Sequence, residues 1–184
     1  MDLLTAIKTR ASALKIRDPA PSREHLQLIL EAGARAPDHG KLAPWRFTVL
    51  QGEARHVLGE LMAQSLKARN PEADADELRR EQKKALRAPC IIAVAAHITP
   101  SQKVPEIEQA LAVGAAAQNM LLTAHALGYG AMWKTGPAAY NPAIKTALGF
   151  TTEDHIVALI YIGSIEIAGE LRAAALEDRV KWMG

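Results

Sequence analysis

Two short stretches made almost entirely of apolar residues constrain the fold more than any other feature of this chain. They are CIIAVAA at 90–96 and HIVALIYIG at 155–163, and both are rich in branched side chains. Such runs are typical of strands covered on both faces, because a strand with one face in water alternates apolar and polar residues. We therefore expect a central sheet with helices on each side.

A long helical segment is the best source of that cover. PEIEQALAVGAAAQNMLLTAHALG, at 105–128, has apolar or small residues on nearly every side, which predicts a buried helix. Polar residues between 118 and 125 interrupt it and argue against a membrane span. The small residues 114–117 would let another backbone approach closely, as from a second subunit.

The remaining sequence alternates between helical and extended patterns. Residues 3–14 carry apolar side chains at helical spacing, and Ser22 is suited to cap a second helix that Pro37 would end. The further expected elements are strands at 46–52 and 129–136 and two charged, solvent-facing helices at 53–70 and 74–87, which would form a peripheral excursion. Together these patterns predict an α+β fold with a mixed central sheet flanked by helices, in a chain that forms a dimer.

Composition narrows the classes of function. The chain has 184 residues, 49% hydrophobic and 23% charged, as expected for one globular domain spanning 1–184. A net charge of +2 and few aromatic residues argue against nucleic acid as a partner. The N-terminus lacks the pattern of a signal peptide and Cys90 has no second cysteine to pair with, so we expect a cytoplasmic protein.

Arg10 is an anomaly within the first predicted helix. On a helical wheel it lies close to Leu3, Ile7 and Leu14, so a helix that runs this far would point a guanidinium at the core. A buried charge needs a partner, and the guanidinium fork suits a phosphate, for which Ser12 offers a hydroxyl group. An internal salt bridge, or a helix that stops before Arg10, would explain the position equally well.

The loop ARAPDHGKLAPW, at 34–45, contains two further candidate ligand contacts. Arg35 sits where the second helix ends, and a cation there is also favourable for the helix dipole alone. His39 is either a turn residue exposed to solvent or a donor to a ligand. The six histidines are scattered, so we predict no metal site.

The end of the strand predicted at 129–136 carries three adjacent residues of interest. Trp133, Lys134 and Thr135 offer an aromatic face, a cation and a hydroxyl group. They could face a ligand, or they could be a core tryptophan beside an exposed lysine. Cys90, at the head of an apolar strand, is expected to be a core residue rather than a nucleophile.

The order of several motifs resembles that of the nitroreductase family of FMN enzymes. The motifs are R-x-S at 10–12, GARAPDHGKLAPWRFTVLQG at 33–52, RAPCIIAV at 87–94, KVPEIEQALAVGAAAQNMLLTAHALGYGAMWKTG at 103–136 and VALIYIG at 157–163. The likeness is in register over almost the whole chain and looks closest to the short YdjA-type branch.

The resemblance implies a homodimeric nitroreductase-type sandwich with FMN at the subunit interface. NADH or NADPH would reduce the flavin, and a nitro-aromatic, quinone or similar electron-poor acceptor would reoxidise it in a ping-pong scheme, so no side chain need be catalytic. A flavin-binding module without turnover and a purely structural dimer are the alternatives. The implied FMN contacts are Arg10, Ala11, Ser12, Arg35, His39, Trp133, Lys134 and Thr135. The implied nicotinamide contacts are Thr123, Ala124, His125, Ala126, Leu127 and Gly128.

The chain also departs from the family pattern. Many members carry serine, asparagine and glutamine where this chain has Asp38, Lys41 and Ala43. The common basic residue two positions after the serine is Leu14 here, with Lys15 beside it. The sequence therefore leaves open which cation faces the pyrimidine end of the flavin. The candidates for phosphate contacts in the C-terminal tail are Arg172, Arg179 and Lys181.

Overall fold

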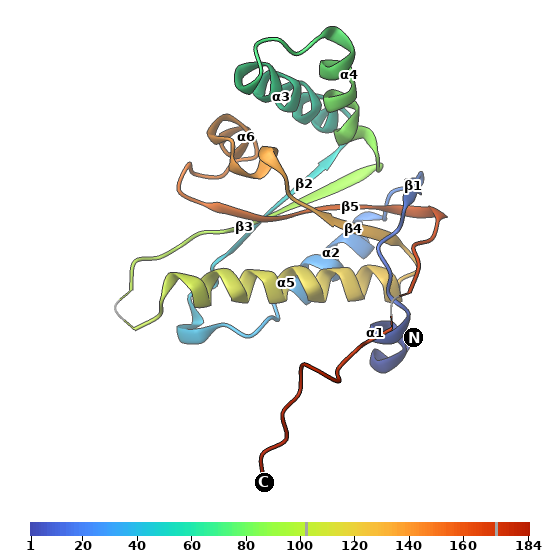
Figure 1. The fold of residues 1–184 in the computed structure, drawn as a ribbon, viewed down its shortest axis with the longest axis vertical. Coiled ribbons are helices and arrows are strands. Elements are labelled where there is room, and N and C mark those ends of the chain that lie inside the picture. The colour runs from blue at the N-terminus through green and yellow to red at the C-terminus, as the bar shows by residue number, and fades with distance from the viewer. Residues whose placement is uncertain (102, 172) are drawn as a thin grey trace.

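The two apolar runs form neighbouring strands of a five-stranded sheet in the computed structural model, which describes residues 1–101, 103–171 and 173–184 (Figure 1). Strand β3 (Cys90–Ala96) pairs with β5 (His155–Ile167), and β2 (Trp45–Gln51) pairs with the other edge of β3. Strands β4 (Gly130–Lys134) and β1 (Lys15–Arg17) both pair with β5. The strands expected at 46–52 and 129–136 are thereby confirmed.

All pairings among the described strands are antiparallel, so the expectation of a mixed sheet was wrong. The apolar runs arise instead from burial on both faces. Along β3, Ile91, Ala93 and Ala95 belong to one core, while Cys90 and the remaining even-numbered residues belong to the other. Every residue of β3 is buried, so a polar side chain on this strand would be costly unless the core supplied it with a hydrogen-bond partner.

One face of the sheet is covered by α5 (Glu106–Ala126), as predicted, and also by α2 (Arg23–Gly33). The hydroxyl of Ser22 accepts a hydrogen bond from the backbone N–H of His25 and caps α2, so the predicted N-cap is confirmed. An added Cβ at Gly33 would lie 2.9 Å from the Met120 side chain, so the glycine allows α2 to approach α5. No helix among the described residues is long and apolar enough to cross a membrane.

The other face is covered by α3 (Glu53–Arg69), α6 (Pro142–Ala147) and the 3-10 turns Lys84–Leu86 and Pro137–Tyr140. Helix α4 (Ala75–Lys83) buries no residue and forms a projecting hairpin with α3 (Figure 1). The two helices expected at 53–70 and 74–87 are present, but the second ends at Lys83 and continues as the 3-10 turn Lys84–Leu86. However, α3 is not purely solvent-facing, because Leu58 and Met62 pack into the core.

The first helix is shorter than expected. Helix α1 (Leu3–Thr9) ends at Arg10, which has extended backbone angles, and Leu3, Ile7 and Leu14 are 66%, 54% and 66% exposed. The predicted helix to residue 14, with this apolar face in the core, was therefore wrong. The physical reason is competition from the sheet: Ala13 donates its N–H to the carbonyl of Ala131 in β4 (3.1 Å).

Candidate functional site

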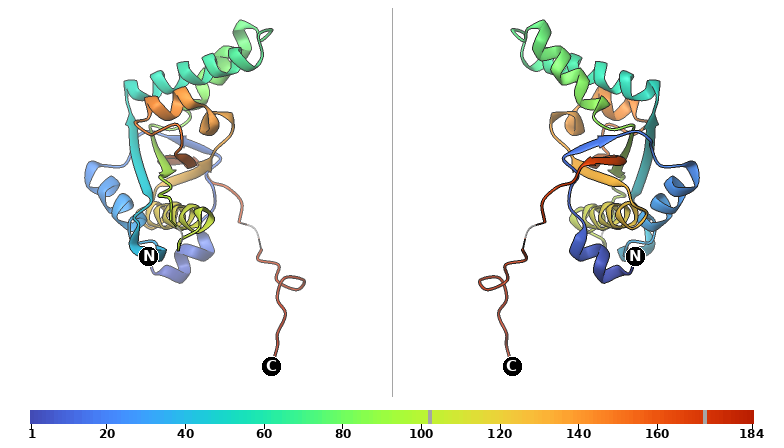
Figure 2. Two further views of the ribbon diagram at one scale, coloured as in Figure 1. Left: turned by 90° about the vertical axis from the view of Figure 1, so that its left-hand side faces the viewer. Right: turned by 90° about the vertical axis from the view of Figure 1, so that its right-hand side faces the viewer.

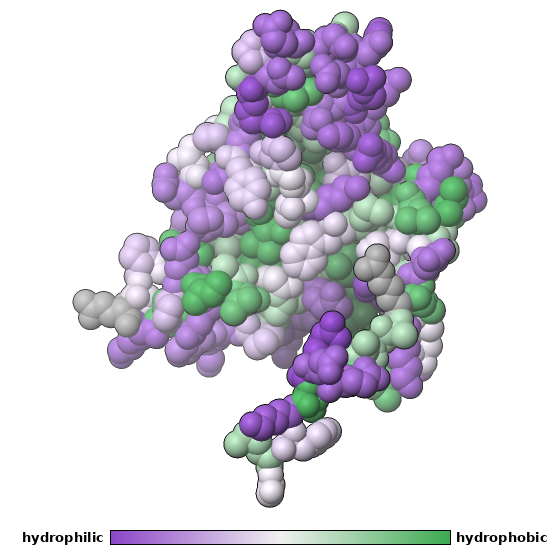
Figure 3. Space-filling model, viewed as in Figure 1, coloured by the Kyte–Doolittle hydropathy of each residue, from purple (hydrophilic) through white to green (hydrophobic). Residues whose placement is uncertain are grey.

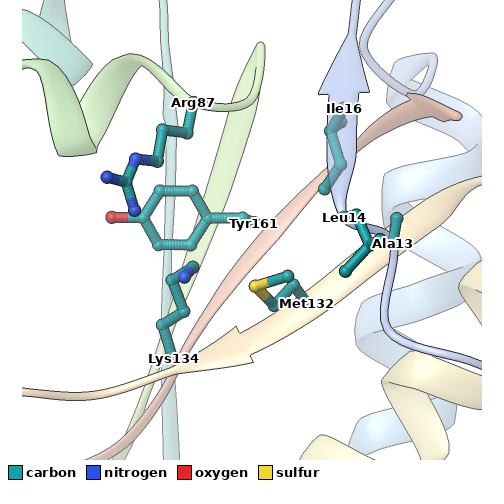
Figure 4. A pocket seen from close by; sticks show the side chains of 7 residues that line it. All are labelled: Ala13, Leu14, Ile16, Arg87, Met132, Lys134 and Tyr161. Atoms are coloured by element: carbon teal, nitrogen blue, oxygen red, sulfur yellow. The ribbon is translucent and has the colours of Figure 1, made fainter. Parts of the chain in front are cut away.

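Three adjoining cavities lie along the N-terminal segment and β4. Leu14 lines both the first and the second, and Arg87, Lys134 and Tyr161 line both the second and the third. The first, here called the Arg10 cavity, is lined by Ile7, Lys8, Arg10, Ala11, Ser12, Leu14, Gly169, Glu170 and Leu171. The second, the strand cavity, is lined by Ala13, Leu14, Ile16, Arg87, Met132, Lys134 and Tyr161 (Figure 4). The third, the cation cavity, is lined by Met62, Glu81, Lys84, Arg87, Lys134, Thr135, Gly136, Ala138 and Tyr161.

Backbone pairing holds the Arg10 cavity beside the sheet. Leu14 donates its N–H to the carbonyl of Ile167 (2.9 Å), which fixes the segment that carries Arg10 and Ser12. A Cβ at Gly169 would collide with the carbonyl oxygen of Ser12, so only glycine permits this close approach. The predicted contacts Arg10, Ala11 and Ser12 thus line one cavity.

Arg10 itself is half-buried at the end of α1. The early helix stop, one of the two structural alternatives, is what the chain adopts. In the described ranges no carboxylate forms an ion pair with its guanidinium, although Glu170 lines the same cavity. The positive charge is therefore available to an anion.

Strand alternation separates the three residues at the end of β4. Met132 pairs with Tyr161, and both side chains reach the strand cavity with Lys134. Trp133 lies on the opposite face of the strand, where its indole N–H donates to the carbonyl of Val157 (3.0 Å). Lys134 and Thr135 line the cation cavity, whereas Trp133 points away from it and is still 37% exposed.

The cation cavity concentrates positive charge. Burial lowers the pKa of Lys134, and the nearby charges of Arg87 and Lys84 lower it further. Lys84 pairs with Glu81 (Nζ–Oε2, 2.6 Å), but within the part of the chain that the structure describes neither Arg87 nor Lys134 has a carboxylate partner. The cavity is suited to an anion or to an electron-rich edge of a ligand.

Tyr161 adds a hydroxyl group to this cluster. Burial raises the pKa of Tyr161 to about 12, so the phenol stays protonated at neutral pH and can donate a hydrogen bond. Figure 4 shows its hydroxyl directed toward the side where Arg87 and Lys134 extend. Sequence reasoning missed Lys84, Arg87 and Tyr161. The one signal in the sequence that could have pointed to this cluster was Tyr161, because it is the single hydroxyl-bearing residue of the run 156–163.

The loop with Arg35 and His39 lies away from these three cavities. Arg35 lines a separate cavity with Trp45, and Trp45 pairs with Ala96, at the far end of β3 from Cys90. The seven residues of β3 span about 20 Å. The structure therefore does not bring this loop to the three adjoining cavities within one chain.

The loop is held by its own contacts. Nδ1 of His39 lies 2.5 Å from Oε2 of Glu108 on α5, and the carboxylate of Asp38 accepts a hydrogen bond from the N–H of Ala43 (2.6 Å). Lys41 and Ala43 both have positive φ, of 55° and 47°, which is strained for residues with a side chain. Lys41 and Ala43, two of the residues at which the chain departs from the family pattern, thus set the shape of the loop. Asp38, the third, stabilises the turn through its hydrogen bond to Ala43.

The residues expected to contact nicotinamide have structural roles at the C-terminus of α5. Ala124 is buried in the core between the sheet and α5, and the N–H of Gly128 bonds to the carbonyl of His125 as the helix ends. Nε2 of His125 lies 2.8 Å from the hydroxyl of Thr9 and so connects α5 to the end of α1. Their contact with nicotinamide stays a prediction, as it does for Thr123, Ala126 and Leu127.

Arg179 and Lys181 lie in the C-terminal tail. Arg179 donates to the carbonyl of Ala175 (2.7 Å), and Lys181 is exposed, while Arg172 lies outside the described residues. Burial raises the pKa of the Cys90 thiol to about 12, as expected for a core cysteine rather than a nucleophile.

Comparison with known proteins gives concordant matches. The model of a family described as "Nitroreductase family" matches residues 7–164. A protein of Haemophilus influenzae named "Putative NAD(P)H nitroreductase" is 41% identical over 167 residues, which cover 89% of each chain. "Putative NAD(P)H nitroreductase YdjA" of Escherichia coli is 36% identical over 167 residues, covering 91% of this chain and 90% of that protein.

A solved structure agrees with these sequences. The crystal structure of a "putative nitroreductase in complex with FMN" from Desulfovibrio desulfuricans superposes with a TM-score of 0.76 at 27% identity. The superposition covers 100% of this chain and 98% of that one.

Proposed function

Because the chain belongs to the nitroreductase family, we propose that it is an FMN-dependent oxidoreductase. It would take reducing equivalents from NADH or NADPH and deliver them to nitro-aromatic, quinone or similar electron-poor acceptors in a ping-pong scheme. The observation that carries this proposal is the row of three cavities, which has Arg10 at one end and Arg87 with Lys134 at the other. The residues 1–184 would form one FMN-binding domain.

The Arg10 cavity suits the phosphate end of FMN. A guanidinium without an ion-pair partner in the described ranges stands beside the hydroxyl of Ser12, and both groups bind phosphate oxygens well. Lys8 lines the same cavity and adds a second positive charge. We assign the phosphate to this end.

The strand and cation cavities suit the ring end. Leu14 and Met132 offer apolar contact, while Lys134 and Arg87 supply positive charge. When bound, FMN accepts a hydride and leaves negative charge on the N1–C2=O edge of its ring, which cations stabilise. Lys15 is a poorer candidate for that role because it pairs with Glu166 (2.6 Å). We assign the pyrimidine-facing cation to the cluster of Lys84, Arg87 and Lys134.

The site is proposed to be completed by a second copy of the chain. The strand cavity measures about 130 Å³, below the range of roughly 300–1,000 Å³ usual for ligand pockets. Large apolar side chains are also exposed on α1, including Leu3 and Ile7, and in the first turns of α5, including Ile107 and Leu111. A homodimer would cover this surface, and the partner loop would bring Arg35 and His39 to the ring.

The test is reconstitution followed by reduction. Purified protein is loaded with FMN, freed of excess cofactor and titrated with NADH and NADPH without oxygen while the flavin absorbance is recorded. We expect about one FMN per chain and bleaching by at least one dinucleotide. Failure to retain flavin would contradict the proposal, and retention without bleaching by either dinucleotide would indicate a flavin-binding module without turnover.

A further inference from the structure

A second, basic groove adjoins the cation cavity on its outer side, between α3 and α4. We call it the α4 groove. It shares Glu81, Lys84 and Arg87 with the cation cavity. Its volume is about 560 Å³, and it is lined by Leu66, Glu77, Arg80, Glu81, Lys83, Lys84 and Arg87. Figure 3 shows that the surface of this hairpin is predominantly hydrophilic.

The cations of the groove share one helical face. Positions 80, 83, 84 and 87 follow the i, i+3, i+4 and i+7 spacing along α4 and the turn that continues it. Their side chains therefore form a row that begins on the projecting hairpin and ends at Arg87, beside the proposed flavin ring. A charged row in this position extends the positive charge of the site outward.

The carboxylates of the groove are already engaged. Glu77 accepts a hydrogen bond from the backbone N–H of Asp74 (3.0 Å) as part of the capping box of α4, and Glu81 pairs with Lys84. Over residues 1–101, 103–171 and 173–184, Arg80, Lys83 and Arg87 have no ion-pair partner. An ordinary solvated helix face would balance its charges locally.

Arg79 illustrates that ordinary arrangement on the same helix. It directly precedes Arg80 in sequence but pairs with Asp76, one turn earlier. Of the groove's cations, Lys84 is thus paired with Glu81, whereas Arg80, Lys83 and Arg87 form no ion pair among the described residues, although Arg80 is near enough to Asp74 to help lower the pKa of that carboxyl group. This contrast indicates that the groove is suited to bind an anion.

Resting on the proposed function, we propose that the α4 groove binds the phosphate groups of the reduced dinucleotide donor and favours NADPH over NADH. The donor must place its nicotinamide at the flavin, and the groove leads outward from that point. Several spaced cations match a ligand with several phosphates better than they match a single carboxylate on an acceptor. NADPH carries one phosphate more than NADH, so the row of cations discriminates in its favour.

The experiment removes charge from the groove and leaves the flavin site intact. The double variant Arg80→Gln/Lys83→Gln is compared with Arg79→Gln, both loaded with FMN. Arg80 and Lys83 do not line the cation cavity, and α4 buries no residue, so flavin content and thermal unfolding serve as checks. The measurements are KM and kcat for each dinucleotide, KM for the acceptor, and calorimetric binding of NADP⁺ to the oxidised protein.

We expect KM for NADPH to rise and the affinity for NADP⁺ to fall by roughly tenfold in the double variant, as estimated for the loss of two exposed charge contacts. KM for NADH should rise less, and kcat and KM for a neutral nitro compound should not change. Arg79→Gln should behave like the unmodified protein.

Two results would overturn the inference. One is a double variant whose KM for NADPH and NADP⁺ affinity equal those of Arg79→Gln. The other is an unchanged donor KM with a raised KM for 4-nitrobenzoate but not for its neutral methyl ester, which would assign the groove to anionic acceptors. If no dinucleotide reduces the flavin of the unmodified protein, the proposed function is contradicted instead. The inference about the groove can then still be decided from NADP⁺ binding, because that measurement needs no turnover.

Discussion

Lys134 is held in a position where its charge is costly without a ligand. Burial lowers its pKa below 10.5, and Arg87 and Lys84 add repulsion. A lysine whose pKa is lowered in the folded state destabilises the fold while it is protonated, and this cost disappears as the pH rises toward 10.5. An electron-rich ligand edge would offset the same repulsion, so the residue links cofactor binding to stability.

Lys134→Met should therefore have opposite effects on stability and on binding. We expect the variant without FMN to unfold at a slightly higher temperature than the unmodified protein, with a difference that narrows as the pH approaches 10.5. FMN affinity should fall about tenfold. Lys145→Met, which removes the bond to the Thr152 carbonyl, is the control and should leave FMN affinity unchanged. A lower unfolding temperature for Lys134→Met would contradict this interpretation.

Arg10→Ala tests the phosphate end. Because the guanidinium is proposed to contact a phosphate directly, its loss should weaken FMN binding about ten- to hundredfold by calorimetry. The fold should persist, since Arg10 follows a helix in which only Ala6 is buried. Lys15→Ala is the matched control, because Lys15 already pairs with Glu166. Equal FMN affinities of the two variants would show that Arg10 has another role.

At the scale of elements, the sequence was most informative where one periodicity dominates. The strands at 90–96 and 155–163, and the capped helix after Ser22, were predicted correctly because burial on both faces and a local cap are visible in sequence. The prediction that the first helix continues to residue 14 was wrong, because Ala13 pairs with β4, a strand more than 100 residues away in the sequence. The buried side of α3 was likewise hidden by its many charged residues.

Gly59 controls the contact between the two helices of the projecting hairpin. A Cβ at this position would lie 2.5 Å from the carbonyl oxygen of Gln82, and backbone cannot move away cheaply. Gly59→Ala should therefore lower the free energy of unfolding by about 1–3 kcal/mol in denaturant titrations. Gln64→Ala, at an exposed position of the same helix, should change it by less than about 0.5 kcal/mol. Similar stabilities for both variants would contradict the tight crossing.

For the molecule as a whole, the predicted site is only partly assembled within one chain. Arg10, Ala11, Ser12, Lys134 and Thr135 line adjoining cavities, while Arg35 and His39 lie at the other end of the sheet. Sequence motifs identify such residues but do not indicate which chain supplies each. The C-terminal tail also runs away from the body of the chain (Figure 2), with Trp182 91% exposed. These features support a site shared between two copies.

Mixed dimers can test that sharing. Chains with Arg10→Ala are combined with chains that carry Arg35→Ala and His39→Ala, and the mixed dimer is isolated with two different tags. If each site combines the cavities of one chain with the loop of its partner, one site of the mixed dimer is intact. We expect about one tightly bound FMN per mixed dimer and none in either parent. If the mixed dimer binds no FMN, the loop and the cavities of one site must come from the same chain.

The most direct measurement of function is the second half of the reaction, followed alone. Protein loaded with FMN is reduced with a stoichiometric amount of NADPH or NADH without oxygen and then mixed with a neutral nitro-aromatic compound in a stopped-flow instrument. We predict that the flavin absorbance returns as the acceptor is consumed, at a rate that rises with acceptor concentration. A flavin that stays reduced in the presence of nitro-aromatic and quinone acceptors would contradict an oxidoreductase of this class.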